Sequence, residues 1–191
     1  MKKIVVTALV ICFCMLHIHV FAVPAPQSAE ISGDTTVRGG TYSTANYGTQ
    51  NLMEVKRGES TSDTARYSYV GLNLAQIRQN YESYNIKSAV FSITTKISAA
   101  TVNAIPLGLY YVSDDNWSET TITMGNKPAY SAKITDLNVP LGTVTGTTFQ
   151  IDLTKVVENE LKNAEDNKLS FVILVDTGND SLGFHTKEAS D

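Results

Sequence analysis

Residues 65–74 read ARYSYVGLNL, and their alternation is the clearest indication of the fold. Small or apolar residues occupy every second position, with other residue types between them: Ser68, Val70, Leu72 and Leu74 against Tyr67, Tyr69, Gly71 and Asn73. A two-residue period is typical of a β-strand with one face toward a core and the other face outward. Residues 89–97, AVFSITTKI, repeat the pattern. Both stretches therefore predict strands covered on one face.

Working outward from these two stretches, the rest of the chain also consists of short runs. Further strands are predicted over 51–56, 106–112, 141–144, 149–153, 169–176 and 182–185. Residues 169–175 are nearly continuous in apolar side chains, as in a central strand buried on both faces. Only 74–80 and 153–164 have helical features. The pattern predicts one all-β domain over 30–191, a β-sandwich or jelly roll of two antiparallel sheets with one or two short helical turns.

The first 22 residues have the pattern of a secretory signal peptide. Lys2 and Lys3 precede an apolar run over 4–16, and the small-residue pattern at 20–22 suits cleavage. The apolar run is short for a permanent anchor, and a retained membrane helix is the alternative. Residues 23–29 are expected to form a linker. We therefore expect a secreted, extracellular protein that has no membrane contact after removal of the signal.

Removal of this segment changes the cysteine content and the charge. Cys12 and Cys14 both lie inside it, so no disulfide is expected in the mature chain. Without Lys2 and Lys3, 13 basic residues stand against 19 acidic ones, a formal charge of −6. This balance argues against nucleic acid as a partner, because phosphates favour a basic face.

Groups suited to catalysis are few in the mature sequence. His185 is its only histidine, it has no cysteine, and GxSxG, GxGxxG and P-loop motifs are absent. We therefore predict that the protein is not an enzyme. A small polysaccharide lyase or hydrolase with His185 or Tyr69 as the base is a further hypothesis.

Two acidic turns are candidates for a metal. Asp114 and Asp115 follow one predicted strand, and Asp176 and Asp180 lie in a turn near the C-terminus. Ca²⁺ takes carboxylate oxygens from loops of this kind. The same residue types also form Asx turns and helix caps. The sequence thus requires no cofactor and leaves calcium as an option.

Six segments occur in a fixed order across 34–190: TTVRGGTYSTANYGTQNLMEVKRG, ARYSYVGLNL, IKSAVFSI, YYVSDDNWSETTITMGNKPA, FQIDLTKVV and LSFVILVDTGNDSLGFHTKEAS. Together they resemble the DNRLRE-type module, carbohydrate-binding module family 96. The resemblance implies a secreted, non-catalytic β-sandwich that is usually attached to polysaccharide lyases or cell-surface proteins. It also implies an acidic polysaccharide, such as alginate, as the ligand class.

The sequence departs from the family pattern in three places. Met124 stands where the family commonly has tryptophan, which is expected to alter the packing of the core. Gly71 occupies an outward position that often carries Lys or Arg, so one basic contact is expected to be lost. The chain stops at Asp191, where most members continue into a final strand, and an edge strand is expected to be missing.

Alternation also assigns side chains to faces. Val37, Met53 and Val55 are expected in the core, which turns Arg38 and Lys56 outward. On the strand arrangement that the resemblance implies, the outward residues form one basic, aromatic patch: Arg38, Lys56, Tyr67, Tyr69, His185 and Lys187. Cationic donors suit uronate carboxylates, and flat rings suit sugar faces. Glu54 lies between these cations and could neutralise them. Trp117 is expected to be a structural anchor rather than a sugar contact.

The sequence therefore predicts a secreted carbohydrate-binding module for an acidic, uronate-containing polysaccharide, appended to or associated with polysaccharide-degrading enzymes. The alternative is a structural or adhesive module of a cell surface or matrix that keeps the fold without a working sugar site.

Overall fold

The computed structural model describes residues 26–81, 86–98 and 104–189. The predicted signal peptide, 1–22, and the first residues of the predicted linker lie outside these ranges. The described residues form nine strands, two α-helices and one 3-10 turn. Their bounds are β1 Glu30–Arg38, η1 Gly40–Tyr42, β2 Leu52–Lys56, β3 Arg66–Asn73, α1 Ala75–Tyr81, β4 Val90–Ser98, β5 Ile105–Val112, β6 Lys133–Val139, β7 Thr148–Asp152, α2 Thr154–Asn163, β8 Lys168–Val175 and β9 Ser181–His185. Neither described helix is long and apolar enough to span a bilayer.

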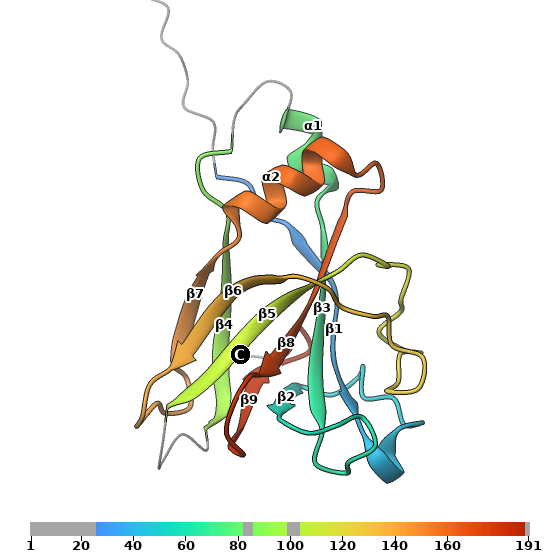
Figure 1. The fold of residues 1–191 in the computed structure, drawn as a ribbon. Coiled ribbons are helices and arrows are strands. Elements are labelled where there is room, and N and C mark those ends of the chain that lie inside the picture. Colours follow the sequence, from blue (N-terminus) through green and yellow to red (C-terminus); the bar gives the residue numbers. More distant parts are fainter. Residues whose placement is uncertain (1–25, 82–85, 99–103, 190–191) are drawn as a thin grey trace, which may run out of the picture.

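The strands form two antiparallel layers. One layer has the order β6-β5-β8-β3-β1, and the other has the order β2-β9-β4-β7. A single β2–β3 pair, Lys56 with Arg66, joins them into a nearly closed sheet. Helices α1 and α2 lie together at one end, and the β1–β2 and β2–β3 loops lie at the other (Figure 1). The prediction of an all-β fold is confirmed.

The main core lies between the two layers. Alternate residues of each strand point into it, so Val70 and Leu72 of β3 meet Phe171 of β8 and Phe184 of β9. The Phe91 ring meets the Phe171 ring edge to face at a centroid distance of 5.2 Å. The alternation in residues 65–74 therefore assigns the inner face of β3 correctly.

A second, smaller core covers the other face of the five-stranded layer. Val37, Tyr69 and Val172 lie on that face, beneath Ile122 and Met124 of the β5–β6 loop. Tyr69 is 0% exposed, and its hydroxyl donates a hydrogen bond of 2.8 Å to the carbonyl of Pro128. The expectation that Tyr69 faces solvent is wrong. Alternation identifies the face of a strand, but a long loop covers this one.

Trp117 anchors the covering loop to the sheet. Its indole N–H donates to Ser170 Oγ over 3.0 Å, and its ring meets the Tyr69 ring edge-on at 6.0 Å. Gly71 lies beneath the indole, where a Cβ atom would approach Trp117 Cζ2 to 3.2 Å and Ser32 Oγ to 2.9 Å. The expectation that Gly71 marks a lost basic contact is therefore wrong, because this position accommodates the indole.

Substitution of Gly71 tests this packing. We expect Gly71→Arg to lower the free energy of unfolding by about 1–3 kcal/mol, because Trp117 and Ser32 must shift. Urea denaturation measures the change. Unchanged stability together with tighter polysaccharide binding would show instead that the position faces a ligand.

The predicted strands lack β1, and they also differ from the structure at two neighbouring segments. Residues 141–144 form no strand: Leu141 is 59% exposed, Val144 is 66% exposed, and Gly142 has a φ of +79°. Strand β6, just before them, was not predicted. Its sequence, KITDLNV, has only two buried residues and therefore little apolar alternation.

Candidate functional site

An open groove of about 590 Å³ lies on the outer face of the five-stranded layer, beside the β5–β6 loop, which adds Tyr130 to its lining. Tyr67 of β3 and Tyr110 of β5 belong to its lining, and Leu174 of β8 lies between these strands. The end of β2 adds Lys56, and the loop after β2 adds Arg57 and Glu59. Segments far apart in the sequence thus meet at one surface.

Gly108 makes room for the aromatic wall of this groove. A Cβ atom at Gly108 would lie 2.6 Å from the ring of Tyr110 and 2.8 Å from a carboxylate oxygen of Asp176. The Tyr110 ring also approaches Tyr130 to a centroid distance of 5.4 Å, and Tyr130 is 41% exposed. An exposed aromatic ring next to polar side chains is suited to contact with the apolar face of a sugar.

Tyr67 connects the β2–β3 loop to the sheet. Its hydroxyl donates to the carbonyl of Gly58 over 2.7 Å. Burial raises the pKa of Tyr67, and the neighbouring Tyr130 and Glu59 raise it further. Lys127 Nζ lies 6.0 Å from the centroid of the Tyr67 ring. This part of the groove therefore combines a neutral phenol with positive charge.

The cations of the groove differ in their partners. In the part of the chain that the structure describes, Lys56, Arg57 and Lys127 form no ion pair. Lys133, in contrast, contacts Asp136 at 2.8 Å and Asp176 at 2.7 Å. The first three cations thus keep their hydrogen-bonding capacity for a ligand.

The predicted six-residue patch does not form as one surface. Lys56 and Tyr67 line the groove, whereas Tyr69 is buried beneath the loop. The Arg38 guanidinium stacks on Tyr42 at 4.1 Å and lies 5.5 Å from the Tyr47 ring, in the β1–β2 loop.

Two further members of the predicted patch lie elsewhere. His185 is half-buried on β9, where its register partner is Leu52 of β2. Lys187 follows β9 and is engaged by carboxylates. Glu54 also behaves differently from the prediction, because its carboxylate lies 3.2 Å from Arg66 Nε.

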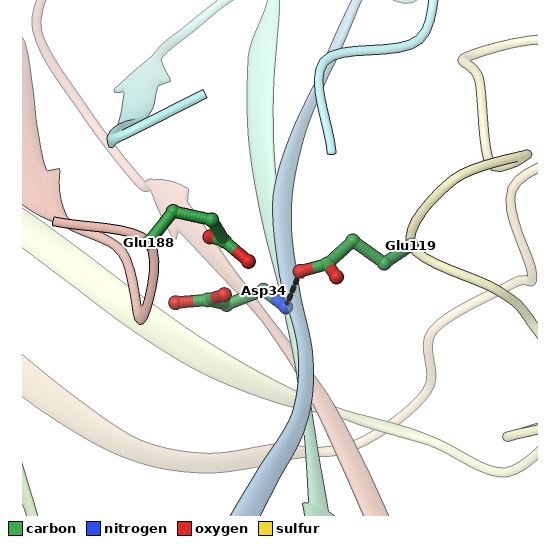
Figure 2. A group of neighbouring side chains, drawn as sticks. All are labelled: Asp34, Glu119 and Glu188. Carbon is green, nitrogen blue, oxygen red and sulfur yellow. Dashed lines mark hydrogen bonds between the residues drawn. The ribbon is translucent and has the colours of Figure 1, made fainter. Parts of the chain in front are cut away.

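Asp34, Glu119 and Glu188 form an acidic cluster (Figure 2). The Lys187 ammonium forms an ion pair with each of the three carboxylates. One oxygen from each carboxylate lies within 4.8 Å of the others. The backbone N–H of Asp34 donates to Glu119 Oε1 over 2.8 Å, and the Lys187 N–H donates to Asp34 Oδ2 over 2.8 Å. The Lys187 ammonium occupies the centre of this group, so a metal ion could bind here only after displacing it.

The Asp34 carboxyl is 3% exposed, and its titration predicts a pH effect on stability. Burial raises its pKa from 3.8 to about 6, against the lowering effect of Lys187. Between these values the folded state binds the proton more tightly than the unfolded state, so ionisation of Asp34 lowers stability as the pH rises. We expect Asp34→Asn to remove this loss, worth roughly 1–3 kcal/mol between pH 4 and pH 7.

Urea denaturation of both proteins across that pH range measures the difference. The stability of the variant relative to the parent protein should be greatest at pH 7 and should decrease toward pH 4. A difference in stability that did not change with pH would contradict the raised pKa of Asp34.

The four predicted calcium ligands do not come together. Asp114 accepts the N–H of Asn116 at 3.3 Å in a local turn. Asp176 is held by the Tyr110 hydroxyl and by Lys133, each at 2.7 Å. Among the described residues, the acidic triad above is the group whose oxygens approach within metal-binding range, and it contains none of Asp114, Asp115, Asp176 and Asp180. Among the described residues, no three of the four predicted carboxylates approach one another within metal-binding range, and calcium binding stays a prediction.

Sequence reasoning missed Arg57, Tyr110 and Tyr130 of the groove lining, and also Lys127 and Lys133, which lie 6.0 Å from the Tyr67 ring centroid and 5.4 Å from the Tyr110 ring centroid. Alternation could have found one of them, because Tyr110 falls out of phase with Leu107 and Leu109 on a predicted strand. Lys127 and Tyr130 lie outside strands, where no period assigns a direction.

A second hollow, of about 570 Å³, lies between the β1–β2 and β2–β3 loops. Its lining includes Thr41, Ser43 and Asp63, and Asp63 Oδ1 accepts the Thr41 N–H at 2.6 Å. The described residues that line it include neither an aromatic ring nor a cation. The groove is therefore the stronger candidate site.

An antiparallel β-sandwich with an open groove of tyrosines and unpaired cations defines a binding module. The chain belongs to carbohydrate-binding module family 96, whose family model matches residues 25–191. A gellan lyase of Bacillus sp. is similar to it, with 24% identity over 125 residues. That match covers 65% of this chain and 5% of the lyase.

Proposed function

We propose that this carbohydrate-binding module is secreted, is not catalytic and binds an acidic, uronate-containing polysaccharide in the tyrosine groove. One observation carries the proposal. Lys56 and Arg57 line the groove together with Tyr67, Lys127 Nζ lies 6.0 Å from the Tyr67 ring centroid, and none of the three cations has an ion pair among the described residues. Charged nitrogen donors form the strongest hydrogen bonds with carboxylates.

The aromatic side chains support the same ligand class. Tyr110 and Tyr130 add aromatic rings to the groove that the cations share, which suits a sugar chain better than a small inorganic anion. The similarity to a gellan lyase agrees with a module that works beside a polysaccharide-degrading enzyme. The signal-peptide pattern of residues 1–22 supports secretion.

The positions of the two predicted bases support a non-catalytic role. His185 lies on the other layer, and the Tyr69 hydroxyl is engaged by Pro128. Burial also raises the pKa of Tyr69 above that of an ordinary tyrosine. A base needs both access to its substrate and a pKa near the working pH. Release of unsaturated or reducing ends from polyuronates by purified protein would contradict this part of the proposal.

Affinity electrophoresis tests the binding proposal. Alginate, polygalacturonate or gellan in the gel should slow the mature protein, and a neutral glucan should not. Added salt should weaken the retardation, because exposed charges are screened. Unchanged mobility in every acidic polymer would overturn the proposal and favour the structural or adhesive alternative.

A further inference from the structure

The groove carries different charge at its two sides. Tyr67 of β3 and Tyr110 of β5 stand on either side of β8, separated by two strand spacings of about 5 Å each and by a two-residue offset along the strands. On the Tyr67 side the groove presents Lys56, Arg57 and Glu59, with Lys127 over the ring. Three cations against one carboxylate leave this side positive.

The Tyr110 side has no free cation among its described residues. Its ammonium, Lys133, already contacts the carboxylates of Asp136 and Asp176. Asp176 lines the groove and also accepts the Tyr110 hydroxyl at 2.7 Å. Two carboxylates share one ammonium, so this side is negative. A ligand carboxylate placed here would meet like charge.

Uncharged sugars find suitable partners on the Tyr110 side. The Asp176 side chain is 19% exposed and can accept a sugar hydroxyl, and Asn179 also belongs to the groove lining. The exposed Tyr130 ring, whose centroid lies 5.4 Å from that of Tyr110 and which also neighbours Tyr67, adds an apolar face between the two sides. Hydroxyl acceptors beside an aromatic face are the groups that a neutral sugar ring requires.

We infer that the groove takes a uronate carboxylate on its Tyr67 side and an uncharged sugar on its Tyr110 side. The preferred ligand is then a polysaccharide in which uncharged residues separate the uronates, rather than one that is charged at every residue. This inference rests on the proposed function, and it adds the charge spacing of the ligand.

Esterified polyuronates test the spacing, because methyl esterification removes charge from an otherwise constant backbone. Alginate and polygalacturonate would each be used unesterified, half-esterified and fully esterified. We expect the half-esterified form of a bound polymer to bind at least as tightly as the unesterified form, despite its lower charge. A purely electrostatic surface would instead lose affinity steadily with each step of esterification, and that result would overturn the inference.

A matched pair of variants tests the residue responsible. Asp176→Asn removes the carboxylate that lines the groove, and we expect its affinity for the unesterified polymer to rise about threefold to tenfold as the like-charge repulsion disappears. Asp136→Asn removes the same charge from the other partner of Lys133. The Asp136 side chain is 76% exposed and does not belong to the groove lining. Its affinity should change much less.

The outcomes separate this inference from the proposed function. Equal affinities for the two variants would overturn the role of Asp176. A steady loss of affinity with esterification would overturn the inferred charge spacing of the ligand, while the proposal of an acidic-polysaccharide module would stand. Absence of binding to every form of both polymers and to gellan would instead overturn the proposed function.

Discussion

Charge reversal of Lys56 and Arg57 is expected to abolish polysaccharide binding. The two side chains lie at the positive side of the groove and form no ion pair among the described residues. Each charge-assisted hydrogen bond is worth about 1.5–3 kcal/mol, so loss of two corresponds to an affinity decrease of about 100-fold or more. Isothermal titration of Lys56→Glu/Arg57→Glu with an acidic oligosaccharide measures the decrease.

Lys155→Glu supplies the matched control. Lys155 is exposed on α2, at the end of the sandwich away from the β2–β3 loop (Figure 1). This variant changes the net charge in the same direction and should keep near-normal affinity. If Lys155→Glu lowered the affinity as much for each unit of charge changed as the double variant does, the net charge of the protein rather than the groove would hold the ligand. Thermal denaturation of all three proteins checks that folding is unaffected.

Truncation of Trp117 is expected to cause the largest loss of stability. Its indole covers Gly33 and Gly71, meets Tyr69 and donates to Ser170. Removal of a large aromatic side chain from such a site costs about 3–5 kcal/mol. We expect Trp117→Ala to lose about 3 kcal/mol of unfolding free energy in urea, because the indole is only half-buried.

Trp117→Phe separates packing from the hydrogen bond. Phenylalanine retains much of the ring contact but cannot donate to Ser170, so about 1 kcal/mol should be lost. Equal losses for the two variants would show that the hydrogen bond, rather than packing, anchors the loop. A loss below about 1 kcal/mol for Trp117→Ala would contradict its role as the anchor.

The sequence predicted the strands that have a strong apolar pattern, whether alternating or nearly continuous. Residues 65–74 and 169–176 correspond to β3 and β8, two adjacent inner strands of one layer. It failed at β6, whose edge position leaves few buried side chains. It also failed at 141–144, where local apolar residues in a loop imitate a short strand. Alternation therefore identifies strands in proportion to their burial.

The site was less predictable, because alternation does not say what covers a face. Tyr67 and Tyr69 share the outer face of β3, but the β5–β6 loop buries Tyr69 and leaves Tyr67 at the groove. Ion pairing introduced a second error. Lys187 was predicted as a ligand contact, yet it is engaged by carboxylates from β1 and from the loop. Such contacts join residues up to 153 positions apart, which no local pattern reveals.

The central claim is that the tyrosine groove holds the polysaccharide, and backbone amide chemical shifts test it most directly. Titration of ¹⁵N-labelled protein with a uronate-containing oligosaccharide should shift the amide signals of residues 56–59, Tyr67, Tyr110 and Tyr130. Signals near Arg38 and Tyr42, and those near Lys187, should remain unchanged. Saturable shifts confined to those two regions, with none in the groove, would contradict the account.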